Sequence, residues 1–250
     1  MRNLKELFHD NGGNMRLGIM QPYFFPYIGY FSLIKHTDRF ILLDKVQFIR
    51  HGWIERNRIL RQSGAWCYIS VPLKKHSHNT LISDIEINNS VNWKQKIISQ
   101  LGYYKGAPFF YKILNLVNTI LKPEIQNIVE LDLYALQNVC EYLGIKTPLE
   151  IFSKMALKIE TPTEADEWAL NICRSMRGVN EYWNPVGGKE IFNSEKYYKN
   201  NIELYFQKMS IPEYRQKDNL FEPALSIIDV MMFNSLEEIH YMLDSFELVR

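Results

Sequence analysis

Cysteine is scarce in this sequence, and positive and negative charges nearly balance. The 250 residues include only three cysteines, Cys67, Cys140 and Cys173, and none of them forms a CxxC pair. Their wide spacing in apolar segments is typical of reduced packing residues and argues against a disulfide framework. The formal net charge of +1 gives no global field for nucleic acid or an acidic membrane.

Long apolar runs are also missing. No stretch approaches the roughly 18 uninterrupted apolar residues of a membrane-spanning helix. Residues 1–14 are polar, end in Asn-Gly-Gly-Asn and lack the apolar middle of a signal peptide. We therefore expect a cytoplasmic protein without membrane insertion, in which residues 1–14 form a dispensable extension.

Several catalytic motifs are absent as well. There is no Gly-x-Ser-x-Gly elbow and no sequence-adjacent cysteine and histidine, which disfavours a serine or cysteine hydrolase. The GxxxxGK[ST] spacing of a P-loop is not found. His76 and His78 have no third ligand at a metal-site spacing, so we expect no metal site. No particular cofactor is indicated.

The residues that are present predict an α/β fold. Apolar residues make up 46% of the chain, enough for a proper core. Strand patterns occur at 15–20, 39–43, 66–73, 81–87, 147–159, 181–183 and 202–206. Helical patterns occur at 31–36, 93–101, 109–121, 124–144, 161–177 and 236–243. This alternation favours one domain over 15–250, built on a parallel Rossmann-like sheet with a mostly helical subdomain at about 91–145.

The segment Gln21-Pro22-Tyr23-Phe24-Phe25-Pro26-Tyr27-Ile28-Gly29-Tyr30-Phe31 joins the first strand to the first helix. Its two prolines fix φ and remove amide donors, and Gly29 allows close backbone approach. We interpret it as a ligand-facing loop at the carboxyl end of the first strand, with Gln21, Tyr27 and Gly29 as candidate site residues. The alternative is an aromatic turn that plugs the core.

A local basic excess forms the second candidate feature. Indole, amide and guanidinium groups gather at Trp53, Arg56, Asn57 and Arg58, and Lys74 and Lys75 follow. Gly187-Gly188-Lys189 comes after a predicted strand and offers backbone amides beside a lysine. These groups suit a small anionic ligand such as a nucleotide sugar. A solvated charged face and an ordinary tight turn are the alternatives.

Polar residues near strand and helix ends are candidates for chemistry. Asp44 follows the second predicted strand and is the first choice for a general base, with Asp229 as the second. Ser226 lies three residues before Asp229, on the same helical face. Gln21, Gln47 and Asn57 are suited to orient an acyl group or sugar hydroxyls. For Ser226 and Asp229, a helix cap and a structurally satisfied carboxylate are the alternatives.

Together these blocks resemble the WbqC-like family of bacterial proteins. The resemblance is carried by the loop from Met20 to Phe31 and, in order, by residues 44–48, 52–58, 71–75, 185–189 and 221–229. It covers residues 15 to about 243. The family pattern often has Gln-Pro-Asn where this chain has Gln21-Pro22-Tyr23. Membership implies a cytoplasmic protein associated with surface polysaccharide and O-antigen biosynthesis.

The resemblance leads to an expectation about activity. We expect a transferase that modifies a nucleotide-linked amino sugar, a dTDP- or UDP-sugar, by N-acylation or aminoacylation such as glycyl transfer. Acyl-CoA, aminoacyl-tRNA, and free acid with ATP are all open as donors. A non-catalytic glycan-precursor binding or accessory protein is the main alternative. A distant likeness to nucleotide-binding folds of the HIGH-motif type adds a nucleotidyltransferase-like enzyme, although the motif's histidines are absent here.

Overall fold

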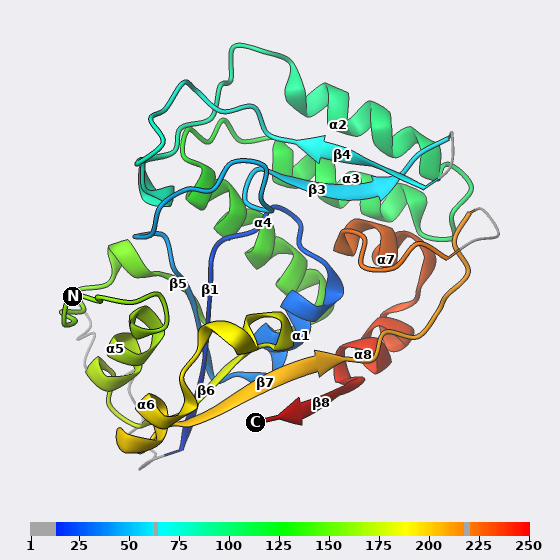
Figure 1. Cartoon of the computed structure of the whole chain (residues 1–250). Helices are drawn as coiled ribbons and strands as arrows, with labels where there is room; N and C mark the ends of the chain where they lie inside the picture. The colour runs from blue at the N-terminus through cyan, green and yellow to red at the C-terminus, as the bar shows by residue number, and fades with distance from the viewer. Residues whose placement is uncertain (1–13, 63–64, 218–220) are drawn as a thin grey trace, which may run out of the picture.

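A six-stranded sheet lies at the centre of the molecule (Figure 1). Its strands are β1 (Met15–Met20), β2 (Arg39–Leu42), β5 (Leu149–Ile151), β6 (Val179–Pro185), β7 (Glu203–Met209) and β8 (Phe246–Val249). Their order is β5-β2-β1-β6-β7-β8, and all neighbours are parallel except β7 and β8. The structure, a computed structural model, describes residues 14–62, 65–217 and 221–250. The predicted α/β fold with a parallel Rossmann-like sheet is confirmed.

Helices cover both faces of this sheet. One face, with Phe40, Leu42 and Trp183, packs with α1 (Ile28–His36), α4 (Ile128–Leu143), α7 (Ile227–Phe233) and α8 (Leu236–Asp244) in one apolar cluster. The other face, with Leu17, Ile19 and Ile41, packs with α5 (Glu167–Ser175) and α6 (Ser194–Lys199) in a second cluster. The near-continuous apolar strands follow from burial on both sides.

The chain between β2 and β5 forms a large insertion. It contains the antiparallel hairpin of β3 (Arg56–Leu60) and β4 (Trp66–Ser70), then α2 (Trp93–Leu101), α3 (Phe110–Leu121) and α4. Figure 1 shows that β1 runs toward this hairpin, with α2 and α3 beyond it. The predicted helices at 93–101, 109–121 and 124–144 are present. A separate subdomain at about 91–145 stays a prediction, as does the dispensable extension, which apart from Asn14 lies outside the described residues.

Two strand predictions were wrong over most of their length. Residues 81–87 hold the short 3-10 helix η2 (Ile82–Asp84) and single bridges to three different segments, so no continuous ladder forms. Ile82, Ile85 and Ile87 are all buried, and the spacing of the first two matches a helical turn better than strand alternation. In the predicted strand 147–159, only Leu149–Ile151 pairs with a neighbour, and the 3-10 helix η4 (Phe152–Lys154) follows.

The helix predicted at 161–177 begins later than expected. α5 starts at Glu167, because the Glu167 carboxylate accepts hydrogen bonds from Thr163 N and Oγ1 at 2.7 and 2.8 Å and thereby holds a preceding turn. By contrast, α4 ends as predicted: Gly144 has φ 69° and closes the helix in the left-handed conformation. Within the described ranges, no helix has the length and apolar character needed to span a membrane.

Candidate functional site

The strand order creates a topological switch point beside β1. From β1 the chain passes through α1 to β2 on one side, and it later enters β6 on the other side. Ligands of open α/β sheets bind outside the carboxyl ends of the strands at such a point. Gln21 follows β1 and is partly exposed, while Asn184, the last residue but one of the neighbouring β6, donates to Ile19 O at 3.5 Å. This edge is the candidate site.

The loop from Gln21 to Gly29 is fixed at this edge by its neighbours. Phe24 N donates to Trp53 O at 2.9 Å, and Asn57 Nδ2 donates to Phe24 O at 3.1 Å. Ser226 Oγ donates to Phe25 O at 2.8 Å, where the backbone has φ 42°. Asn57 and Ser226 therefore hold the loop backbone, and the structure brings both predicted site residues to the predicted loop.

The start of α1 has no capping side chain. Its N-cap, Tyr27, makes no side-chain cap hydrogen bond, and the first turn contains no acidic residue. The Tyr27 ring crosses this turn so closely that a Cβ built on Gly29 would lie 2.4 to 2.6 Å from it. Gly29 is needed for that approach. A helix N-terminus at the end of the central strand offers backbone amides to an anion.

Asp44 lies at the same edge, two residues after the end of β2, and is 1% exposed. Its carboxylate accepts hydrogen bonds from Ser153 N at 2.9 Å and from Ser153 Oγ at 2.5 Å. These contacts tie the ends of β2 and β5 together. They give Asp44 a structural partner, and its role as a base stays a prediction.

Asp229 is buried in a closed hydrogen-bond network. Tyr104 OH donates to Oδ2 at 2.8 Å, and Tyr214 OH and Gln216 Nε2 donate to Oδ1 at 2.6 and 2.9 Å. Burial raises the pKa of Asp229 to about 6, while these hydrogen bonds oppose the rise. The carboxylate joins α7 to the segments that carry Tyr104 and Tyr214, so it connects elements rather than facing the switch-point edge.

Arg56 and Arg58 point to the face of the hairpin opposite Asn57, since side chains alternate along a strand. The Arg58 guanidinium lies 5.7 Å from the Trp53 ring and 5.2 Å from the Trp66 ring, and it donates to Ala224 O at 3.1 Å. Arg56 lies 4.0 Å over Tyr68 and donates to His51 O. A phosphate contact by either residue stays a prediction.

The remaining basic candidates lie apart. Exposed Lys74 pairs with Glu86 at 2.6 Å, Lys75 is exposed beside it, and Gln47 Nε2 donates to His78 O at 2.8 Å. Gly187, Gly188 and Lys189 belong to the 3-10 helix η5 (Val186–Ile191), which follows β6. Lys189 Nζ donates to the backbone oxygen of Arg250, just after β8, at 2.6 Å. The structure does not gather the five predicted basic residues into one cluster.

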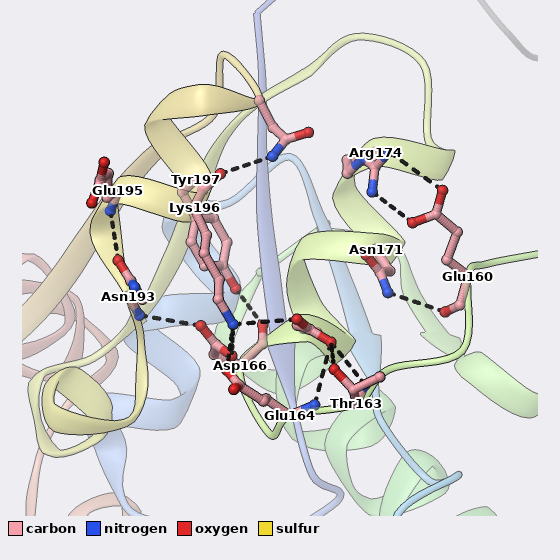
Figure 2. A network of polar contacts seen from close by, with 12 residues as sticks. Glu160, Thr163, Glu164, Asp166, Asn171, Arg174, Asn193, Glu195, Lys196 and Tyr197 are labelled. Carbon is pink, nitrogen blue, oxygen red and sulfur yellow. Dashed lines mark hydrogen bonds and ion pairs between the residues drawn. The ribbon is translucent and has the colours of Figure 1, made fainter.

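A second polar network lies between α5 and α6 (Figure 2). Lys196 Nζ lies 2.5 Å from Glu164, 3.1 Å from Asp166 and 3.2 Å from Glu167. The Glu164 hydrogen bond, with those of the other two carboxylates, raises the pKa of Lys196. Each of the three carboxylates pairs with Lys196, and Asp166 also accepts a hydrogen bond from Asn193 N at 3.2 Å. This network joins two helices and is structural.

Buried polar atoms without a hydrogen-bond partner mark residues that sequence reasoning missed. Among the described residues, they include Asp132 Oδ1 and Oδ2 on α4 and Glu55 Oε2 just before β3. Asp132 is 0% exposed although it is an acid. The sequence spacing does indicate that Asp132 is buried, because it lies four residues after Ile128 and four before Leu136, on the apolar stripe of the helix.

These features define a Rossmann-like α/β protein with a rigid loop at the switch point of its sheet. A model of the WbqC-like protein family matches residues 21–241, and the chain belongs to this family. It is similar to the uncharacterised protein Rv1507c of Mycobacterium tuberculosis, with 27% identity over 223 residues, which cover 88% of this chain and 93% of that protein. No solved structure matches the chain.

Proposed function

We propose that this protein is a cytoplasmic transferase that modifies a nucleotide-linked amino sugar in O-antigen or lipopolysaccharide biosynthesis. The reaction is N-acylation or aminoacylation of the sugar amine, with glycyl transfer as one form. Membership in the WbqC-like family supports the polysaccharide setting. The donor is an acyl or aminoacyl compound, and aminoacyl-tRNA is one candidate.

The observation that carries the proposal is the rigid Gln21–Gly29 loop, which connects β1 at the switch point to the uncapped start of α1. In this position the backbone amides of a first βα turn suit the diphosphate of a nucleotide. Tyr27 lies over that turn and is half-buried, so its ring is available to contact the ligand.

Replacing Gly29 with alanine tests whether the nucleotide binds at the first turn of α1. The added methyl group would overlap the Tyr27 ring, at 2.4 Å, and displace it from the first turn of α1. We expect affinity for UDP- or dTDP-amino sugars to fall roughly tenfold, or about 1.4 kcal/mol. Isothermal titration of wild type, Gly29→Ala and Gly102→Ala measures this, since a Cβ at Gly102 meets nothing within 4 Å. Binding by none of the three proteins would overturn the proposed function.

A non-catalytic binding or accessory role is the second candidate. It is favoured by the hydrogen bonds that already engage Asp44 and Asp229, the two predicted bases. If the protein is an enzyme, Asp44→Asn should abolish turnover of the amino sugar and change its affinity by less than about threefold, within roughly 0.7 kcal/mol. Ser153→Ala is the control, because it removes the 2.5 Å hydroxyl partner but leaves the carboxylate. Equal turnover by Asp44→Asn and wild type would remove Asp44 from the chemistry.

A further inference from the structure

The outer face of the β3–β4 hairpin carries arginines that alternate with aromatic rings. Arg56 Cζ lies 4.0 Å from the centre of the Tyr68 ring, and Arg58 Cζ lies 5.2 Å from that of Trp66. Trp53, just before β3, lies 5.7 Å from the same Arg58 carbon. Arg58 is the direct cross-strand partner of Tyr68, so each arginine contacts a ring diagonally opposite it. These five residues form one continuous surface, the cation–aromatic strip.

Solvent reaches every member of the strip. Trp53 is 38% exposed, the Arg58 side chain is 21% exposed, and the other three residues are half-buried. Exposed Arg50 extends the strip at one end, because Arg56 Nη2 donates to the backbone oxygen of His51, the residue that follows Arg50. The strip is thus open to a ligand from solution.

The charge of this surface is positive, and the chain itself neutralises little of it. Residues 50–68 contain four arginines and a single acidic residue, Glu55, in a chain of net charge +1. Glu55 Oε1 accepts a hydrogen bond from a backbone amide at 2.9 Å. Within the described part of the chain, Arg56 donates to backbone oxygens and pairs with no carboxylate, and Arg58 has only Glu222, at 3.8 Å. Guanidinium groups therefore remain for an anionic ligand.

The backbone of the strip is bonded to the loop of the candidate site. Trp53 O accepts from Phe24 N at 2.9 Å, and Arg58 O accepts from Ser226 N at 2.9 Å. Ser226 Oγ in turn donates to Phe25 O at 2.8 Å. The central strand β1 also runs toward this hairpin (Figure 1). A ligand on the strip would therefore lie next to the candidate site.

Single-stranded nucleic acid matches this combination of groups. Unpaired bases stack on aromatic rings and on guanidinium planes, and arginine binds phosphate through two hydrogen bonds. A duplex keeps the faces of its bases stacked on one another and offers none to the rings. A neutral glycan would use the rings without the charges, and an acidic peptide would use the charges without the rings. Because the basic excess is local, a short single strand fits better than a long polyanion.

We propose that the cation–aromatic strip binds the single-stranded end of an RNA that carries the aminoacyl group, an assignment that rests on the proposed function. The donor is then an ester of the terminal ribose, as in aminoacyl-tRNA. The sugar amine forms an amide bond to the aminoacyl carbonyl, and the ester bond breaks. The proton lost by the amine ends on the leaving ribose oxygen, so the products are the acylated sugar and the free RNA.

The first test measures fluorescence anisotropy of a short labelled RNA that ends in CCA, alone and as a duplex. Wild type should prefer the single strand at least about tenfold, because only the single strand can stack on the rings. Trp53→Ala should lower this affinity at least about fivefold, the smallest effect expected for one stacked base. Tyr111→Ala is the control and should change nothing, since Tyr111 is an exposed ring on α3, 75% exposed.

The second variant separates stacking from charge. Arg58→Lys keeps the positive charge but loses the flat guanidinium, so it should weaken binding of the single strand while the dependence on salt stays as in wild type. With three arginines on phosphates, the logarithm of the affinity should fall with the logarithm of the salt concentration at a slope of about −2. Equal affinity of wild type and both strip variants would overturn the inference.

A third measurement needs no variant. RNA that contains 4-thiouridine should cross-link under ultraviolet light to the β3–β4 hairpin of wild type, and cross-links confined to other segments would overturn the inference. So would equal affinity for single strand and duplex, or a neutral oligosaccharide that binds in place of RNA and is lost in Trp53→Ala. If a UDP- or dTDP-amino sugar still binds wild type in those cases, the proposed function stands. Binding of RNA on the strip without binding of any nucleotide sugar would overturn the proposed function and the donor role with it.

Discussion

Replacing Asp229 with alanine is expected to lower the free energy of unfolding by roughly 3–5 kcal/mol at neutral pH. The variant leaves Tyr104 OH, Tyr214 OH and Gln216 Nε2 without their acceptor in a site that is 0% exposed. It also opens a cavity beside α7. Since whole domains are stable by only about 5–15 kcal/mol, chemical denaturation should detect the loss readily. A change below about 1 kcal/mol would mean that these hydrogen bonds add little to stability.

The same carboxyl group should make stability depend on pH. Burial raises the pKa of Asp229 from 3.8 to about 6, so the folded protein holds this proton more tightly than the unfolded chain does. This tighter proton binding stabilises the folded state. The stabilisation is fully present below pH 3.8 and is lost as the pH rises through 6. Over this window wild type should lose about 3 kcal/mol relative to Asp229→Asn, which cannot titrate. Denaturation of both proteins between pH 4 and pH 7 measures the difference, and parallel curves would contradict it.

Gly18→Ala is the second substitution from which we expect a large loss of stability. A Cβ at position 18 would lie 2.6 Å from Cδ2 of Phe40 and 3.3 Å from Thr37 Oγ1, in the middle of the central strand β1. Phe40 is 0% exposed and its ring lies 5.3 Å from that of Tyr30, so it has little room to move. We expect a loss of about 1–3 kcal/mol from overpacking, measured by thermal or chemical denaturation.

Two further variants separate this clash from a general effect of alanine. Gly102→Ala adds a methyl group with nothing within 4 Å and should change stability by less than about 0.5 kcal/mol. The double variant Gly18→Ala with Phe40→Leu should recover part of the loss, because the smaller side chain leaves space for the methyl group. Full additivity of the two single losses would show that Phe40 is not the cause.

The parts of the fold that follow local patterns could be predicted from the sequence. The apolar runs of β1 and β2 and the periodic helices α2, α3 and α4 were found with nearly correct bounds. The hairpin strand β3 was missed, because Arg56, Asn57 and Arg58 are polar and only their pairing with β4 makes the segment a strand. The short edge strand β8 likewise depends on its antiparallel partner β7. Tertiary pairing decides such segments, and the local pattern does not.

The position of the candidate site could be predicted from the sequence, because it depends on the topology of the sheet. Gln21 and Asp44 both follow parallel strands, and parallel strands end at one edge of a sheet. The roles of individual side chains depend on contacts between distant segments. Asn57 and Ser226 contact the loop from 33 and 201 residues away in sequence, and only the three-dimensional structure reveals that they bind its backbone. Lys189 was grouped with other basic residues by charge, but it lies in η5 after β6 and donates to the backbone oxygen of Arg250, beside the end of β8.

The most direct test of a nucleotide site at the start of α1 is a crystal structure of the protein with a UDP- or dTDP-amino sugar. We expect the diphosphate to lie at the first turn of α1, about 3 Å from backbone amides, with the ligand against Tyr27 and the Gln21–Gly29 loop. A ligand on the outer face of the β3–β4 hairpin or along β7 and β8, with this loop untouched, would contradict it.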